Sequence, residues 1–187
     1  MSDRFKEWSS IAMKELTAVF DRMDDSNVRD LLEVIKKTDR IFLLGGGREG
    51  LSTKAFAMRL MHLGKNAYWI WDDTTPSMGE GDLLICACDA ADCGHQNHVV
   101  TMAKKSGATI GLVTAVEDGF MIPLADVKVK VPAAAFHATG DFVPTEQLMG
   151  NLFEQALYVL YNVMVMMLRE EMALTPEDMV ARHRNVE

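Results

Sequence analysis

The sequence predicts an α/β fold built on a parallel β-sheet. Short apolar segments alternate with helical segments along most of the chain, which is the pattern of β-α-β units. The short segments are apolar throughout, which is typical of strands that helices cover on both faces of the sheet. A glycine-rich string follows the first of them, at the kind of position where parallel sheets bind ligands.

Two helices are expected before the first strand. Apolar side chains recur at helical spacing from Phe5 to Met23, so an amphipathic helix opens the chain. Ser26 can cap a second helix, which is expected to run to about Lys37.

The first strand is expected at residues 40–44, and it ends in the string Gly45-Gly-Gly-Arg-Glu-Gly50. A helix follows and stops at Gly64, because glycine favours the end of a helix. Another helix is expected from Asn97 to Ser106. The remaining strands are expected at residues 67–71, 82–87, 109–113 and 127–131.

A long helix is expected from about Thr145 to about Glu171, followed by a short one that Thr175 caps. Its most apolar part, residues 148–168, contains four polar or charged side chains that a lipid-facing helix would rarely tolerate: Asn151, Glu154, Gln155 and Asn162. We therefore expect a buried helix and no contact with a membrane.

Length, composition and charge limit the classes of protein to which this chain can belong. The 187 residues give room for one domain of ordinary size, so residues 1–187 are expected to form a single domain. A hydrophobic fraction of 49% and a charged fraction of 25% indicate a globular chain. The net charge is −8 and the basic residues form no run, which argues against a nucleic-acid partner.

The cysteines indicate a reducing compartment. All three, Cys86, Cys88 and Cys93, lie close together, so they offer no disulfide framework. The polar N-terminus lacks the apolar core of a signal peptide. We expect a cytoplasmic protein.

Three loops are candidate site segments, because ligands bind at the carboxyl ends of parallel strands. They are residues 45–50, 72–77 and 88–95. In the second loop the hydroxyls of Thr74 and Thr75 could face a substrate, although Thr-Thr-Pro is also ordinary turn chemistry.

The glycine loop is suited to an anion. Gly47 and its neighbours let a ligand approach the backbone, and the following helix offers unpaired N–H groups. Arg48 adds a positive charge that suits phosphate or carboxylate, and Glu49 opposes it. The string also fits G-x-G-x-x-G with Asp72 at the spacing of a dinucleotide fingerprint, or it could simply be a turn.

Several longer segments carry a family resemblance. Lys54-Ala-Phe-Ala-Met-Arg-Leu-Met-His-Leu-Gly64, Gly81-Asp-Leu-Leu-Ile85, Met149-Gly-Asn-Leu-Phe-Glu-Gln-Ala156 and Arg182-His183 resemble the 6-phospho-3-hexuloisomerases. These enzymes belong to the sugar isomerase (SIS) domain superfamily. The resemblance covers nearly the whole chain.

The resemblance implies a fold and an activity. The fold would be a flavodoxin-like three-layer sandwich around a five-stranded parallel sheet. The enzyme would interconvert 3-hexulose 6-phosphate and fructose 6-phosphate through an enediol, without metal or organic cofactor. It would be a homotetramer whose helices 3–37 and 145–185 pack at subunit contacts near the active sites. The family's glutamate base would be Glu154, and its acid–base histidine would be His183.

The chemistry of these two residues can be judged separately. Isomerisation needs one base near two adjacent carbons and an acid–base partner for the oxygens. Glu154 lies in an apolar helical segment, where burial would raise its proton affinity, although it could instead pair with an arginine at an interface. Without the resemblance, His183 would be interpreted as an exposed histidine near the end of the chain. With the resemblance, we expect it to reach the active site of a neighbouring subunit.

The loop after the third strand departs from the family pattern. The family carries Ser-Gly-Ser-Gly-Glu-Thr there, where this chain has Cys88-Asp-Ala-Ala-Asp-Cys93. Asp89 and Asp92 would repel a phosphate dianion. Either Arg48, Ser52 and Thr53 hold the phosphate from the first helix, or Asp89, Asp92 and Glu49 accept hydrogen bonds from a free sugar. The predicted substrate-binding residues are Gly47, Arg48, Glu49, Ser52, Thr74, Thr75, Cys88, Asp89, Asp92 and Cys93.

The same loop raises the question of a metal. A site using Cys88, Cys93, His95 or His98 is conceivable, because sulfur and imidazole bind zinc. The spacing fits no structural zinc pattern, however, so we expect no metal. Two functions remain as alternatives to the isomerase of sugar phosphates: an isomerase of free sugars, and a sugar-binding or sensing module without turnover.

Overall fold

A computed structural model describes residues 2–136 and 138–186 of the chain. Its centre is a five-stranded sheet in the order β2-β1-β3-β4-β5, and every neighbouring pair is parallel. The strands are β1 (Arg40–Gly45), β2 (Asn66–Trp69), β3 (Leu83–Ala87), β4 (Thr109–Thr114) and β5 (Val127–Lys130). This order is that of flavodoxin-like folds, and it confirms the predicted class.

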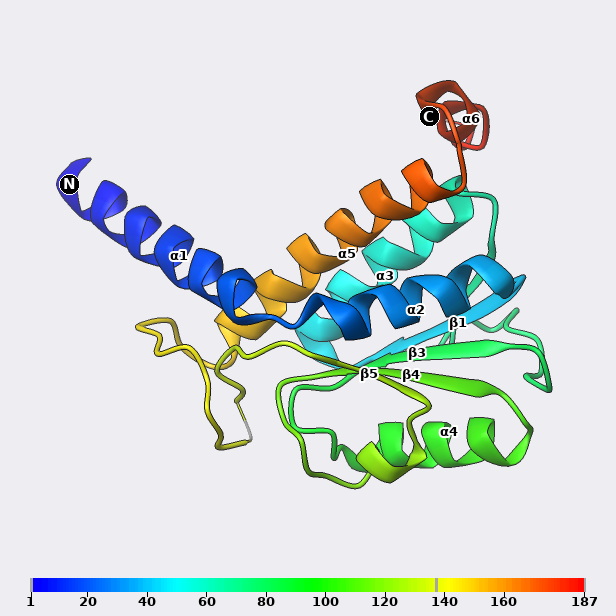
Figure 1. The fold of residues 1–187 in the computed structure, drawn as a ribbon, viewed down its shortest axis with the longest axis horizontal. Helices are drawn as coiled ribbons and strands as arrows, with labels where there is room; N and C mark the ends of the chain where they lie inside the picture. Colours follow the sequence, from blue (N-terminus) through cyan, green and yellow to red (C-terminus); the bar gives the residue numbers. More distant parts are fainter. Residues whose placement is uncertain (1, 137, 187) are drawn as a thin grey trace.

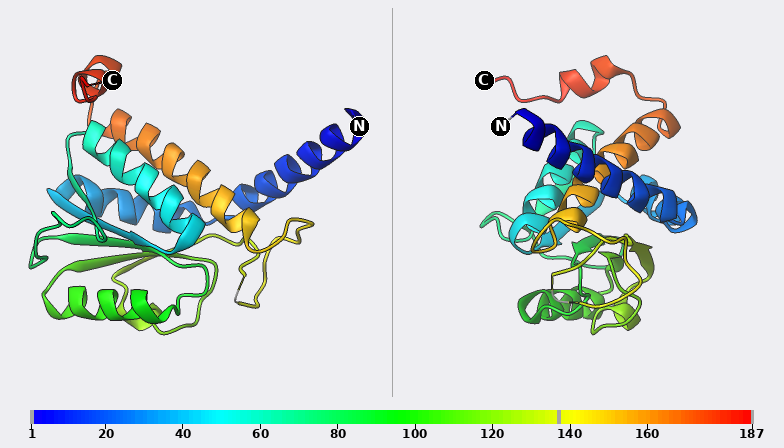
Figure 2. Two further views of the ribbon diagram at one scale, coloured as in Figure 1. Left: turned by 180° about the vertical axis from the view of Figure 1, so that it is seen from behind. Right: turned by 90° about the vertical axis from the view of Figure 1, so that its left-hand side faces the viewer.

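Helices cover both faces of the sheet (Figure 1). One face carries α2 (Asp25–Lys37), α3 (Gly47–His62) and α5 (Asn151–Glu171), and the other carries α4 (Gly94–Lys105) and a short 3-10 turn, η1 (Ile122–Leu124). The first helix, α1 (Ser2–Arg22), extends beyond the end of the sheet, as Figure 1 and the left-hand view of Figure 2 show. The last helix, α6 (Pro176–Ala181), lies at the far end of α5.

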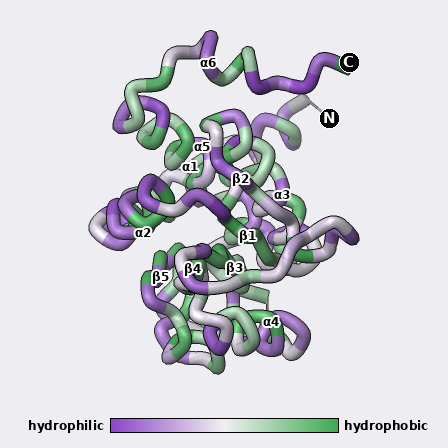
Figure 3. The backbone as a smooth tube through the Cα atoms, turned by 90° about the vertical axis from the view of Figure 1, so that its right-hand side faces the viewer, coloured by the Kyte–Doolittle hydropathy of each residue, from purple (hydrophilic) through white to green (hydrophobic). Residues whose placement is uncertain are grey.

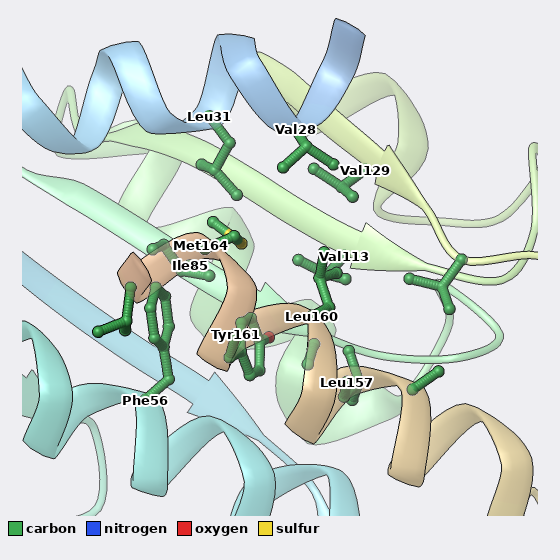
Figure 4. Close-up of a cluster of buried hydrophobic side chains, with 14 of the residues drawn as sticks. Val28, Leu31, Phe56, Ile85, Val113, Val129, Leu157, Leu160, Tyr161 and Met164 are labelled. Carbon is green, nitrogen blue, oxygen red and sulfur yellow. The ribbon is translucent and has the colours of Figure 1, made fainter. Parts of the chain in front are cut away.

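The core is two apolar layers, one on each face of the sheet. Along β1, Ile41 and Leu43 pack into the layer under α2, α3 and α5, and Phe42 and Leu44 pack into the layer under α4. This arrangement explains why β3 and residues 41–44 of β1 are apolar at every position, whereas the edge strand β5 carries two lysines (Figure 3). In the larger layer, Tyr161 of α5 stacks on Phe56 of α3 at a ring distance of 4.5 Å (Figure 4).

Some predicted boundaries were wrong. The long helix begins at Asn151 and not at Thr145, because Met149 and Gly150 both have positive φ angles, of 57° and 73°. The glycine string ends sooner than predicted, since α3 already begins at Gly47. Asp24, and not Ser26, caps α2 through a hydrogen bond to the N–H of Ser26. None of the helices in the described ranges is long and apolar enough to cross a membrane.

Candidate active site

A pocket of about 700 Å³ lies beyond the carboxyl ends of β1 and β3. These two strands flank the point where the strand order reverses, which is where open parallel sheets bind ligands. The loop after β1, the loop after β3 and the segment before α5 form its walls. Its lining includes Gly46, Gly47, Arg48, Glu49, Cys88, Asp89, Asp92, Cys93, His95, Phe136, Met149, Asn151 and Glu154.

Three helices begin at this pocket. The residues that precede α3, α4 and α5 are Gly46, Cys93 and Gly150, and all three line it. In the described part of the chain, none of these three residues caps its helix with a side-chain hydrogen bond. The positive ends of three helix dipoles therefore converge on one cavity, which favours an anionic ligand.

Glycines allow the first of these helices to begin close to its strand. A Cβ atom at Gly50 would lie 2.7 Å from the carbonyl oxygen of Gly45, closer than real Cβ contacts allow. Gly47 has a φ angle of 49°, which glycine adopts without strain. The tight turn places Arg48 and Glu49 in the first turn of α3.

Arg48 joins the first turns of α3 and α5. Its Nε donates to a carboxylate oxygen of Glu154, and its terminal nitrogen donates to Asn151 Oδ1 at 2.7 Å. The Glu154 side chain is 15% exposed, whereas that of Arg48 is 65% exposed. The carboxylate is thus held at the edge of the pocket, with a guanidinium that an incoming ligand can reach.

Glu49 contacts the loop after β3. Its Oε1 accepts a hydrogen bond from the backbone N–H of Asp89 at 3.2 Å, and its carboxyl group also interacts with the Asp89 side chain. Burial, and secondarily the Asp89 carboxylate, raise the pKa of Glu49 to about 8. The side chain therefore holds a proton at neutral pH, and this removes one of the negative charges predicted for the pocket.

Asp89 is fixed by backbone N–H groups. Ala90 donates to Oδ1 at 2.7 Å, and Phe136 donates to Oδ2 at 2.8 Å. A Cβ atom at Gly150 would lie 3.8 Å from the same Oδ2, so the carboxylate lies beside the N-terminus of α5. Asp89 therefore links the loop after β3 to two segments that are distant in the sequence.

The backbone of the loop after β3 is largely occupied by internal partners. Besides Asp89 and Ala90, the N–H of Ala91 donates to Cys88 O at 3.1 Å and that of Cys93 donates to Asn97 Oδ1 at 3.1 Å. Hydrogen bonds within the protein thus use most of the amides that could hold a phosphate at this loop.

Four of the predicted site residues do not line the pocket. The Ser52 hydroxyl is buried and donates to the carbonyl of Glu154 at 3.2 Å, because the early start of α3 turns it toward α5. Thr75 donates to Trp69 O at 2.6 Å within its own turn, and Thr74 is exposed outside the pocket. Within one chain, the side chains of these three residues do not line the pocket.

The fourth, His183, lies at the opposite end of α3. Its ring stacks on His62 with centroids 5.3 Å apart, and neighbouring Arg182 donates to His62 O at 3.2 Å. His62 is thirteen residues after Glu49 in one straight helix, so about 20 Å separates this cluster from the pocket. Within one chain, His183 does not meet Glu154.

The alternative ligand sites receive no support. Cys93 Sγ lies 3.4 Å from His95 Nδ1, but Cys88 is buried and burial raises its pKa to about 12. Among the described residues, no group of three or more His, Cys, Asp or Glu could hold a metal ion. Asp72, the expected ribose acceptor of a dinucleotide site, pairs with Lys54 at 3.2 Å and lies outside the pocket.

Sequence reasoning missed several wall residues. Phe136 and Met149 come from the long segment between β5 and α5, which has no pattern that would place it at the sheet. Gln96 is buried, with its amide oriented to accept from Gly46 N at 2.8 Å and donate to Ala87 O at 3.2 Å. Asn151 was recognised as a polar residue of the apolar helix, but it was not predicted to line the site.

Comparisons with known proteins identify relatives of this chain. No protein-family model matches the chain. It is 33% identical over 157 residues to a 3-hexulose-6-phosphate isomerase of Bacillus subtilis, covering 84% of this chain and 85% of the relative. The 3-hexulose-6-phosphate isomerase of Mycobacterium gastri is also 33% identical, over 95% of this chain and 89% of the relative.

A solved structure shows the same fold. It is that of a Methanococcus jannaschii protein, for which a molecular function as 3-hexulose-6-phosphate isomerase has been inferred. The TM-score is 0.82 at 25% identity, and the match covers 97% of this chain and 99% of that one.

Proposed function

The chain belongs to the 3-hexulose-6-phosphate isomerase family, and from this premise we propose that it is a sugar-phosphate isomerase. The proposed reaction interconverts 3-hexulose 6-phosphate and fructose 6-phosphate through an enediol. The observation that carries the proposal is the convergence of three helix N-termini on a pocket that contains Glu154. The helix ends favour the phosphate, and the carboxylate supplies a base.

Glu154 is the proposed carbon base. It lies in the first turn of α5, lines the pocket and is mostly buried. In the reaction it takes a proton from the carbon next to the carbonyl and returns it to the adjacent carbon. The hydrogen bond from Arg48 holds the carboxylate in place. The chemistry is a proton transfer within one molecule, so we propose that it uses neither a metal nor an organic cofactor.

Arg48 is the proposed phosphate ligand. It lines the pocket together with the helix ends, and its exposed guanidinium can turn toward a ligand. Gly47 lets the phosphate approach the backbone at the start of α3. Ser52 and Thr74 have no part in the proposal, because their hydroxyls lie outside the pocket.

His183 is proposed to contact the substrate in the site of a neighbouring subunit, across a subunit contact in a homotetramer. A groove of about 680 Å³ between α1, α3 and α5 is lined by apolar side chains that include Met13, Leu51 and Tyr158. These three side chains are more than half exposed, which is typical of a surface that another protein chain covers. Because Arg48 and Glu154 also border this groove, a subunit docked there would lie beside the active site.

A free sugar is the second candidate substrate. The occupied amides of the loop after β3 and the carboxylates of Asp89 and Asp92 favour hydroxyl groups over phosphate at that wall. The two candidate substrates differ in which part of the pocket would bind them most strongly. The first relies on Arg48 and the helix N-termini, and the second relies on the loop after β3.

The test is an isomerisation assay with the purified chain. Hexulose and pentulose sugars are offered with and without a terminal phosphate, and ketose products are measured. Turnover of the phosphorylated sugar supports the proposal, and turnover of free sugars alone would replace it with the second candidate. Binding without turnover would indicate a sugar sensor. Cytoplasmic location stays a proposal that rests on the absence of a disulfide framework, and cell fractionation tests it.

A further inference from the structure

One group in the pocket has no part in the function proposed so far. Glu49 lines the pocket from the first turn of α3, as Glu154 does from the first turn of α5. Because the two carboxyl groups also interact electrostatically, they lie near one another around the same space.

Isomerisation needs a second group besides the carbon base. The carbonyl oxygen must gain a proton as the carbon loses one, and the neighbouring hydroxyl must lose its proton later. The candidate for this role, His183, is about 20 Å from the pocket within one chain. Glu49 is a carboxyl group of the same chain, already at the pocket wall.

We propose that Glu49 is the acid–base group that serves the substrate oxygens, and that Asp89 positions it. This inference rests on the proposed function. Glu154 takes the proton from carbon, a C–H bond breaks and a C=C bond forms, and Glu49 gives its proton to the carbonyl oxygen to yield the enediol. The other enediol hydroxyl then returns a proton to Glu49, its C=O bond forms, and Glu154 protonates the adjacent carbon.

The surroundings of Glu49 fit this role. The N–H of Asp89 holds Oε1 at 3.2 Å, and the Asp89 carboxylate is itself held by two backbone N–H groups. Burial and this neighbouring negative charge raise the pKa of Glu49 to about 8, so a proton is available at neutral pH. The titratable and charged groups that face Glu49 are Asp89, Glu154, Cys86, Cys88, Tyr161 and adjacent Arg48.

The experiment compares E49Q, D89N and the control E80Q in the isomerisation assay. Glu80 is exposed and lies near the amino end of β3, whereas the pocket lies beyond the carboxyl end of that strand. Glutamine at residue 49 can keep the contact with the Asp89 N–H but cannot transfer a proton. We expect E49Q to lower kcat by roughly 100-fold or more with little change in KM, and E80Q to behave as the wild type.

The pH profile separates a catalytic role from a structural one. Because the acid must be protonated, wild-type kcat should fall as the pH rises through about 8, and E49Q should lack this fall. D89N removes a neighbouring negative charge and should move the fall to lower pH. An active wild type with unchanged kcat and pH profile in E49Q would overturn this inference alone. A wild type without isomerase activity would overturn the proposed function and this inference with it.

Discussion

The guanidinium of Arg48 donates a hydrogen bond to the carboxylate of Glu154, and this contact joins the first turns of α3 and α5. The two residues are far apart in the sequence and meet at the pocket beyond β1 and β3. The proposed base and the proposed phosphate ligand therefore restrain one another before a substrate arrives. Substitutions of the two should have different kinetic effects.

The first prediction concerns Glu154. E154Q keeps the shape of the side chain and can no longer accept a proton from carbon, so kcat should fall by roughly 100-fold to 10,000-fold. KM should change little, because the amide still fits beside Arg48. Steady-state kinetics measure both constants. E170Q, at the exposed far end of the same helix, is the matched control and should keep wild-type kcat. Similar kcat values in E154Q and E170Q would exclude Glu154 as the base.

The second prediction concerns Arg48. R48A should raise KM for a phosphorylated substrate by roughly 10-fold to 100-fold, because a charge-assisted hydrogen bond contributes about 1.5–3 kcal/mol. R29A is the control, since Arg29 is an exposed residue of α2 that pairs with Asp25. Kinetics with matched sugars, with and without phosphate, give the comparison. An equal loss for both kinds of sugar would mean that Arg48 does not contact the phosphate.

The third prediction concerns the subunit contact. If His183 acts in a neighbouring site, E154Q and H183A are each impaired, and mixed tetramers contain some sites with both native residues. Mixing the two variants under conditions that exchange subunits should therefore restore part of the activity. Size-exclusion chromatography with light scattering should show a tetramer. A fully active monomer, or no recovery in proven mixed tetramers, would contradict a shared site.

The fourth prediction concerns the stability effect of Glu49. Its pKa is raised from 4.5 in the unfolded chain to about 8 in the fold, so the folded state binds more protons between these values. Wild-type stability should fall as the pH rises from 4.5 to 8, and E49Q should lack this fall. Above pH 8, E49Q should be more stable by on the order of a few kcal/mol. Urea unfolding at several pH values measures the difference, and parallel curves for the two proteins would refute the raised pKa.

The fifth prediction concerns the turn before α3. In G50A the new methyl group would meet the carbonyl oxygen of Gly45 at 2.7 Å, and the overlap should lower the free energy of unfolding by about 1–3 kcal/mol. G79A is the control, because a Cβ atom at Gly79 meets nothing within 4 Å. Denaturant titration of both variants tests the contact, and equal stabilities would show that the turn tolerates a side chain.

The sheet could be predicted from the sequence because its central strands, β1, β3 and β4, are buried on both faces. Every residue from Ile41 to Leu44 is apolar and buried, and no polar pattern obscures the strand. The start of α5 could not be predicted so well. Its apolar periodicity continues backward through Leu148, but the positive φ angles of Met149 and Gly150 stop the helix, and φ angles cannot be read from residue types alone.

The site was predictable in part. The loops after β1 and β3 follow directly from the fold class, so Arg48, Glu49 and Asp89 could be placed at one pocket in advance. The hydrogen bond from Phe136 to Asp89 spans 47 residues and has no local pattern. Ser52 lies outside the pocket for a geometrical reason. Since α3 begins earlier than expected, its hydroxyl faces α5 instead of the pocket.

The most direct test of the central claim follows the transferred proton. The chain is incubated with fructose 6-phosphate in heavy water, and nuclear magnetic resonance monitors the carbon-bound hydrogen next to the carbonyl group. We predict that deuterium enters this position with the wild type, and that E154Q abolishes the exchange while E170Q preserves it. A wild-type chain that exchanges no hydrogen, or an E154Q variant that exchanges it at the wild-type rate, would contradict an enediol mechanism based on Glu154.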